Sequence, residues 1–219
     1  MFYDGPTSTD YVNIHALNRA FLKLLRPHPE RFGLDTRQAV RLSGLGRQQM
    51  ERLAATPFLL YTIQEKDELT WRGFCNAEPN ADLFEQGCTQ DADVSNLLAT
   101  TTGFLWQLAQ QNRYSVRMIC GATQYWCEMI TSVTYFDLVT RIRNRGDLLA
   151  SRQAANADIW SKLLVEGVTA ERRVRDAAHI AVLQTLLTGY PGVKEAGWPI
   201  AACKTSPPQL RVADESGKA

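Results

Sequence analysis

Residues 36–55 read TRQAVRLSGLGRQQMERLAA, two short helical patterns joined by a tight turn. This spacing is typical of a helix-turn-helix, in which a small residue at the turn lets two short helices meet. Gly44 occupies the turn, where a left-handed backbone or a close approach would favour glycine. Leu45, Met50 and Leu53 recur on one side of the second pattern. The sequence therefore predicts a helical hairpin whose second helix is locked by these three apolar side chains.

The second helix would present a polar face to solvent. Arginine and glutamine side chains read base edges and phosphates, and the predicted DNA-binding residues are Arg41, Arg47, Gln48, Gln49 and Arg52. An ordinary helical hairpin, which packs inside the protein or contacts another protein, can carry the same residues. Exposure separates the two interpretations. Open side chains on a surface beside Arg41 favour DNA contact, whereas burial against the C-terminal helices favours packing.

Composition limits the classes of protein that this chain can belong to. Its 219 residues make one large or two small domains, with 45% apolar and 21% charged residues. The formal net charge is +1, so DNA binding has to depend on a local patch. No run approaches the roughly 18 apolar residues that a membrane helix needs, and the first residues lack the pattern of a signal peptide. Five irregularly spaced cysteines are typical of reduced thiols. We expect a cytoplasmic protein with no membrane contact.

The segments on either side of the hairpin predict one helix and one small sheet. A helix capped by Thr9 or Asp10 is expected to run to about Arg26, because apolar residues recur at three- and four-residue steps and prolines follow. Residues 58–63, FLLYTI, are typical of a strand. We expect residues 70–74 to pair with it as a β-hairpin, an arrangement similar to the wing that follows some helix-turn-helix motifs.

A known family shares part of this pattern. Residues 42–63, LSGLGRQQMERLAATPFLLYTI, resemble the smaller, helical subunit of the bacterial flagellar master transcriptional regulator. That family has a similar leucine-rich run, a QM-x-x-LA step and a short apolar segment. The resemblance covers about one tenth of the chain, and the long C-terminal half departs from that much shorter family. It implies a cytoplasmic regulatory protein that dimerises, as a homo-oligomer or with a partner subunit, and assists DNA binding.

Four parts follow one another along the chain. An N-terminal helical part at 1–75 contains the hairpins, a polar loop follows at 76–92, a helical bundle occupies 93–190, and 191–219 is a mostly irregular tail. The predicted fold class is therefore mainly α. It combines a helix-turn-helix-bearing N-terminal part and a possible small β-hairpin with a C-terminal helical bundle.

The longest helix is predicted from about Tyr114 to Arg145, where apolar residues recur with helical spacing. We expect its Trp126 and Phe136 to be buried. Three cations close this segment: Arg141, Arg143 and Arg145. Cations at a helix C-terminus oppose the negative end of the helix dipole, and a phosphate-facing patch is the alternative interpretation.

Motifs for catalysis are not found. The sequence has no glycine-rich phosphate loop, no nucleophile elbow and no pair of histidines at metal-ligand spacing. Cys75 and Cys88 lack the second pair of ligands that a zinc site needs. We therefore predict no catalytic residue, no cofactor and no metal. The first functional hypothesis is a transcriptional regulator or DNA-associated subunit. The alternative is a helical adaptor or chaperone that binds proteins and has no DNA contact.

Overall fold

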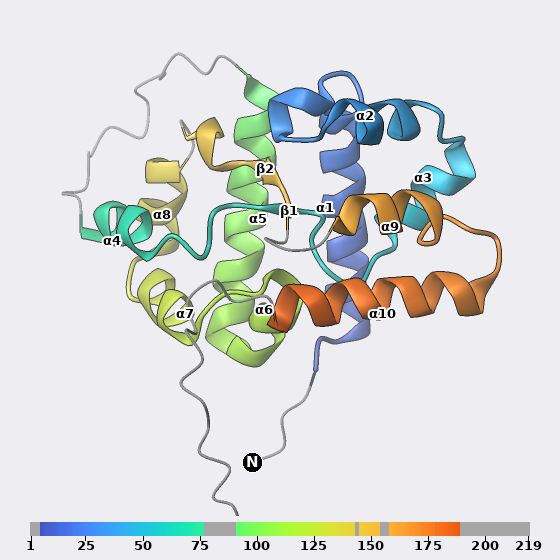
Figure 1. The fold of residues 1–219 in the computed structure, drawn as a ribbon. Helices are drawn as coiled ribbons and strands as arrows, with labels where there is room; N and C mark the ends of the chain where they lie inside the picture. The colour runs from blue at the N-terminus through green and yellow to red at the C-terminus, as the bar shows by residue number, and fades with distance from the viewer. Residues whose placement is uncertain (1–4, 77–90, 143–144, 154–157, 189–219) are drawn as a thin grey trace, which may run out of the picture. The chain divides into compact units, whose positions relative to one another are not determined.

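Two long helices lie side by side at the centre of the fold: α1, Ser8–Leu25, packs against α5, Ala92–Gln111 (Figure 1). The computed structural model describes residues 5–76, 91–142, 145–153 and 158–188. Around the central pair lie, in chain order, η1 (Pro29–Phe32), α2 (Thr36–Ser43), α3 (Arg47–Ala54), β1 (Tyr61–Thr62), α4 (Glu68–Asn76), α6 (Arg113–Cys120), α7 (Gln124–Thr131), α8 (Tyr135–Ile142), η2 (Gly146–Leu148), β2 (Ala150–Ser151), α9 (Ile159–Val165) and α10 (Arg172–Thr188). The described residues are thus mainly α with a single small antiparallel sheet, as the sequence predicts.

Helix α1 begins earlier than its apolar pattern suggested. Thr7 is the N-cap, and its hydroxyl accepts a hydrogen bond from the backbone N–H of Asp10 at 3.2 Å. The Asp10 carboxylate in turn accepts from the backbone N–H of Thr7 at 2.7 Å, which completes a capping box. Asp10 is therefore the third residue of the helix and not its cap. Ile14, Phe21 and Leu25 are among the residues of α1 that are buried in the core.

Helices α2 and α3 form where the sequence predicts them. A capping box between Asp35 and Gln38 starts α2, and the side chain of Gln49 accepts from the backbone N–H of Gly46 at the start of α3. The turn residue Gly44 has φ −75°, an ordinary right-handed value, so a left-handed backbone is not the reason for glycine there. Leu53 is buried as expected, because α3 packs on α1 while α2 packs on α9.

The predicted β-hairpin is wrong in its second strand. Tyr61 and Thr62 do form a strand, but they pair antiparallel with residues 150–151 of β2. Residues 68–76 form helix α4, whose first turn is capped by Asp67. The indole N–H of Trp71 donates to the backbone carbonyls of Ile63 and Gln64, which holds α4 beside the end of the strand. Strand β2 lies almost ninety residues after β1, so no turn joins the two strands directly. The sequence therefore carries no local hairpin signal for this pairing.

The predicted helix from Tyr114 to Arg145 is three separate helices, α6, α7 and α8. Gly121 ends α6 with φ +70°, a conformation that suits glycine. The hydroxyls of Thr123 and Thr134 then cap the first turns of α7 and α8. The glycine and the two threonine caps divide the segment into separate helices, although its apolar residues recur with helical spacing throughout. Trp126 is fully buried as expected, but Phe136 is 70% exposed, so its predicted burial is wrong.

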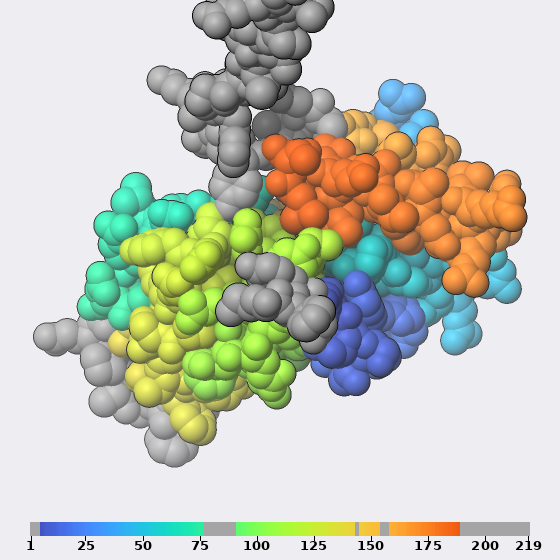
Figure 2. Space-filling view, turned by 90° about the horizontal axis from the view of Figure 1, so that it is seen from below, coloured from blue at the N-terminus to red at the C-terminus, as the bar shows by residue number. Residues whose placement is uncertain are grey.

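The two halves of the chain share a core. Besides the α1–α5 contact, α2 packs on α9, and the Gln38 side chain donates to the Asp158 carboxylate at 2.8 Å. Helix α10 packs on α9 and lies at the surface, which Figure 2 shows from below. Residues 77–90 and the tail at 191–219, for which the sequence predicts a loop and irregular structure, lie outside the described residues. No helix within the described ranges is long and apolar enough to cross a bilayer.

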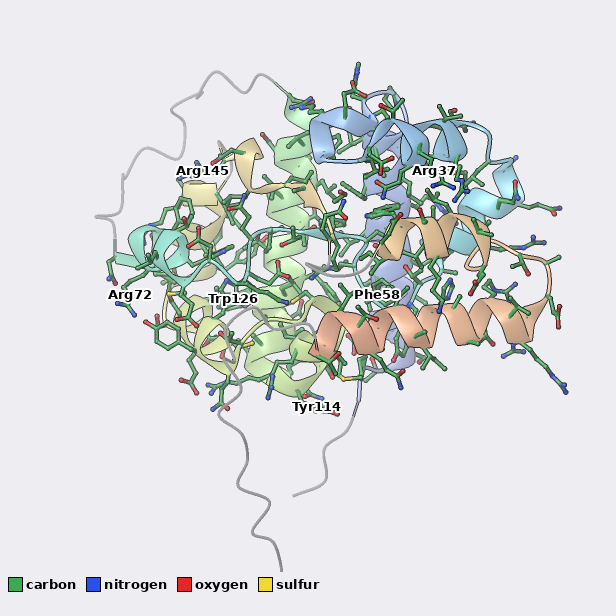
Figure 3. The ribbon with its side chains drawn as sticks, viewed as in Figure 1. Arg37, Phe58, Arg72, Tyr114, Trp126 and Arg145 are labelled. Carbon is green, nitrogen blue, oxygen red and sulfur yellow. The ribbon has the colours of Figure 1, made fainter. Side chains whose placement is uncertain are left out.

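Asn18 connects α1 to the segment that follows α3. Its side-chain N–H groups donate to the Thr56 hydroxyl at 3.0 Å and to the Phe58 carbonyl at 2.9 Å, and they also reach the Ala54 carbonyl. Its side-chain oxygen accepts from the backbone N–H of Leu60 at 2.9 Å. Every polar atom of this buried amide therefore has a partner, as burial requires. Phe58, in this segment, is fully buried (Figure 3).

Arg152 connects the same segment to the C-terminal half. Its guanidinium forms an ion pair with Glu65 at 2.8 Å, although the two side chains are only 6% and 1% exposed. It also donates to three backbone carbonyls, those of Leu59, Tyr61 and Cys120. Its own carbonyl accepts from the indole of Trp160 at 2.9 Å. The buried charge is thus surrounded by acceptors from residues 59–61 at β1, from the end of α6 and from Glu65 between β1 and α4.

Candidate nucleic-acid interface

The first turn of α3 presents Arg47 and Gln48 to solvent. They are the first two residues of the helix, and both are exposed. Neither forms a side-chain hydrogen bond or ion pair with the residues that the structure describes. Side chains with free donors and acceptors at a helix end can approach a ligand without first breaking internal bonds.

Gln49 and Arg52 are committed to contacts within the protein. The side-chain oxygen of Gln49 accepts from the backbone N–H of Gly46 at 2.9 Å. Arg52 is half-buried, and its guanidinium donates to the carbonyl of Val168, just before α10, at 3.2 Å. The predicted residues of α3 therefore fall into two groups. Arg47 and Gln48 are open to solvent, as DNA contact requires, whereas Gln49 and Arg52 help to hold α3 in place.

Arg41 lies on the last turn of α2 and is half-buried. Arg37, one turn earlier on the same helix, is exposed (Figure 3). Hydrogen bonds from Ser161 and Gln38, with the nearby Arg37 charge, hold the pKa of Asp158 below its ordinary value. Arg41 has no side-chain hydrogen bond or ion pair with another described residue, so it remains a candidate for an external contact on α2.

A hollow of about 790 Å³ opens between the end of α1 and the start of α3. Four cations line it, Arg19, Lys23, Arg26 and Arg47, and we call it the basic hollow. Its one acidic residue is Glu51. Lys23 and Arg26 are not among the binding residues that the sequence predicts. Their spacing places them one turn apart at the end of α1, but only the packing of α1 on α3 brings them beside Arg47.

Glu51 is already paired inside this hollow. Its carboxylate lies 2.6 Å from the Arg19 guanidinium and 3.4 Å from the imidazole of His15. The hydrogen bond from Arg19 is the main reason why the pKa of Glu51 is lower than its ordinary value. Arg26 donates to two backbone carbonyls of the α2–α3 turn, those of Ser43 and Leu45. The Glu51 carboxylate is therefore balanced by Arg19 within the hollow. The bonds from Arg26 hold the α2–α3 turn to α1.

A second, larger groove of about 1280 Å³ runs between α1, α5 and α8. Aromatic side chains from α5 and α8 contribute to its walls, among them Phe104, Trp106 and Tyr135. The rings of Trp106 and Tyr135 lie 5.8 Å apart between centroids. Ala20 and Gly103 also line it, and the ring of Tyr135 packs directly against Gly103.

Cys127 is buried, and Arg141 and Arg145 have partners within the protein. Burial raises the pKa of the Cys127 thiol to about 11, so it stays protonated at neutral pH. Arg141 donates to the carbonyls of Phe74 and Cys75, and Arg145 pairs with Asp147. These bonds favour a structural role over a phosphate-facing patch. Arg143 and Cys88 lie outside the described residues.

No cluster of three or more histidine, cysteine or acidic side chains suited to a metal ion occurs within the described ranges. Comparisons with protein-family models, with curated proteins and with solved structures give no match to this chain. The features of the described residues that bear on function are therefore the exposed side chains of α3, the basic hollow and the groove between α1, α5 and α8.

Proposed function

We propose that the protein is a cytoplasmic DNA-associated regulatory protein that inserts the start of α3 into the major groove. The observation that carries this proposal is the exposure of Arg47 and Gln48, both without internal partners among the described residues, on the first turn of a helix that follows a helical turn. In helix-turn-helix proteins the N-terminal residues of the second helix contact base edges. The resemblance of residues 42–63 to a transcriptional regulator subunit points the same way.

The five residues selected from the sequence then have different roles. Arg47 contacts a guanine or a phosphate, and Gln48 pairs with an adenine, since these are the favoured partners of the two side chains. Arg41 contacts the backbone of the DNA. Gln49 and Arg52 orient α3 through their bonds to Gly46 and Val168. With a net charge of only +1, affinity depends on this local surface and on a second copy or a partner subunit.

The test compares DNA binding by the wild type and by an Arg47→Ala/Gln48→Ala variant. Each lost base contact should weaken binding by about 1–3 kcal/mol, while thermal stability stays unchanged because both side chains are exposed. Binding is followed by fluorescence titration with genomic DNA fragments at several salt concentrations, for the protein alone and with candidate partner subunits.

A matched control removes an exposed arginine and glutamine elsewhere, as Arg117→Ala/Gln111→Ala. This control should bind DNA like the wild type. The proposal fails if the wild type shows no salt-sensitive binding in either form. It also fails if the control loses as much affinity as the α3 variant, because binding would then reflect charge anywhere on the surface.

A helical adaptor is the second candidate, and the groove between α1, α5 and α8 favours it. Its aromatic walls offer apolar contacts of the kind that bind a protein segment. If the protein acts as an adaptor, a partner should change the fluorescence of Trp106, and a Trp106→Phe variant should lose that change. Partner binding that Arg47→Ala/Gln48→Ala leaves intact would assign this function to the groove alone.

A further inference from the structure

We propose that the basic hollow between α1 and α3 binds a phosphate group, and that this phosphate belongs to the DNA backbone. This inference rests on the proposed function and adds to it a contact on a different helix. Its central residue is Lys23, which lies on the last turn of α1 and was not among the residues predicted from the sequence.

The charges in the hollow do not cancel. Arg19 and Glu51 balance each other at 2.6 Å. Lys23 and Arg47 have no hydrogen-bond or ion-pair partner in the part of the chain that the structure describes. Arg26 donates only to neutral backbone carbonyls, so no carboxylate offsets its positive charge. Lys23, Arg26 and Arg47 therefore remain around one cavity without a negative partner. An anion bound between them would offset their mutual repulsion.

Rigid elements hold these cations in place. Lys23 and Arg26 extend from the end of α1, against which α3 packs. The two bonds from Arg26, at 3.1 and 3.3 Å, fix its guanidinium to the α2–α3 turn. Leu22, Leu45 and other apolar side chains also line the hollow. Charges beside apolar surface attract an anion more strongly than charges surrounded by water.

A phosphate group fits this position better than other anions, given the residues beside it. Arg47 lines the hollow and is also the first residue of α3, next to the base-reading candidate Gln48. Contacts to phosphates fix the register of a DNA-binding helix, while contacts to bases supply specificity. A phosphate held by Lys23 and Arg26 would thus position Gln48 in the groove. An acidic peptide offers the same charge without this link, and the experiment below includes it.

The first experiment measures the salt dependence of DNA binding for Lys23→Ala. Loss of one phosphate contact should reduce the slope of log K against log salt by about 1. Affinity at 0.1 M salt should fall about eightfold, since each neutralised phosphate contributes a slope of about −0.9. The loss should be equal for all DNA sequences. Lys23→Arg should restore most of the binding, and Arg117→Ala, an exposed cation on α6, is the matched control.

The second experiment adds inorganic phosphate to the protein and records the amide NMR signals of residues 46–48. Saturable shifts in the wild type that Lys23→Ala abolishes are expected. Poly-glutamate of matched charge is titrated in parallel and should compete less well than a DNA duplex. Equal or stronger competition by poly-glutamate would overturn the phosphate assignment in favour of an acidic protein segment.

The outcomes separate this inference from the proposed function. If the wild type binds DNA and Lys23→Ala keeps both its affinity and its salt slope, the phosphate site is wrong while the regulator proposal stands. If the wild type binds inorganic phosphate through Lys23 but binds no DNA, the hollow binds free phosphate. That result overturns both the DNA source of the phosphate and the proposed function. Absence of both kinds of binding overturns the site altogether.

Discussion

Arg152 and Arg47 show two opposite environments for the same side chain. Arg152 is buried, pairs with Glu65 and donates to the carbonyls of Leu59, Tyr61 and Cys120. Arg47 is exposed and has no such partner among the described residues. The first arginine connects segments that are far apart in sequence. The second lies on a short helix and leaves its charge available to a molecule from outside.

The difference separates structural from functional polar groups. A buried guanidinium is tolerated only when nearly all of its donors are satisfied, because an unpaired buried charge is costly. Donors that are already satisfied inside the protein cannot bind a ligand. We therefore assign the region around Arg152 to stability and the start of α3 to binding. We expect the largest effect from a variant of Arg152, which tests this division. Smaller effects are expected from variants that compare a buried ring with an exposed one and that remove a buried histidine.

The largest effect is expected from Arg152→Met. It removes the partner of the buried Glu65 carboxylate and leaves three backbone carbonyls without their donor. Breaking a buried ion pair from one side costs about 3–5 kcal/mol, and the lost carbonyl bonds place this variant at the upper end. Urea denaturation followed by circular dichroism measures the free energy of unfolding.

Arg145→Met is the matched control, because Arg145 forms its ion pair with Asp147 near the surface. An exposed ion pair contributes about 0–1 kcal/mol, so this variant should remain close to the wild type. Equal losses from the two substitutions would show that the region around Arg152 is no more important for stability than a surface pair.

The second prediction compares two aromatic residues that the sequence treats alike. Trp126 is fully buried, and its ring lies edge-on to that of Trp71 with centroids 5.1 Å apart. Trp126→Ala should cost about 3–5 kcal/mol. Phe136→Ala should cost less than about 1 kcal/mol, because most of that ring already faces water. Thermal unfolding of both variants checks the contrast, and a large loss from Phe136→Ala would mean that a partner or a second copy covers this ring.

The smallest effect concerns pH and the buried His179. Its Nε2–H donates to the carbonyl of Gly167 at 3.1 Å, since a carbonyl can only accept. Burial lowers its pKa below the ordinary 6.5, helped by the Arg175 charge, while the bond to Gly167 and the Asp176 charge oppose the shift. The imidazole of His179 therefore binds a proton more readily in the unfolded chain than in the folded protein. The stability that neutral His179 contributes is complete above about pH 6.5 and is lost as the pH falls toward the lower folded pKa.

The measurement is the free energy of unfolding between pH 7.5 and 5. We expect the wild type to lose more stability than His179→Gln over this range. The variant removes the titrating group and keeps a polar side chain of similar length. The same pH dependence in both proteins would show that other groups, such as surface carboxylates, cause it.

Local signals explain what could be predicted from the sequence. The α2–α3 hairpin could be predicted because its turn and its apolar positions lie within twenty residues of one another. The polar face of α3 follows from the same short pattern. The mainly α fold class follows from the three- and four-residue spacing of apolar side chains.

Other predictions failed where a local signal was missed or a distant partner decided. The single helix from Tyr114 to Arg145 ignored the left-handed glycine at 121 and the threonine caps that follow. The hairpin after residue 58 ignored the cap at Asp67, which begins α4. Gly44 was expected for its backbone freedom, yet its φ is ordinary.

The sequence by itself determined the helical class, the two short helices of the α2–α3 pair and the polar face of α3. The tertiary structure decided which side chains of that face stay open, because Gln49 and Arg52 form bonds within the protein. Only the tertiary structure decided that β1 pairs with β2, that Arg152 meets Glu65, and that Lys23 comes beside Arg47. The physical reason is the range of the interactions. Caps and periodicity act over three or four residues, whereas packing between distant elements depends on the burial of the whole chain at once.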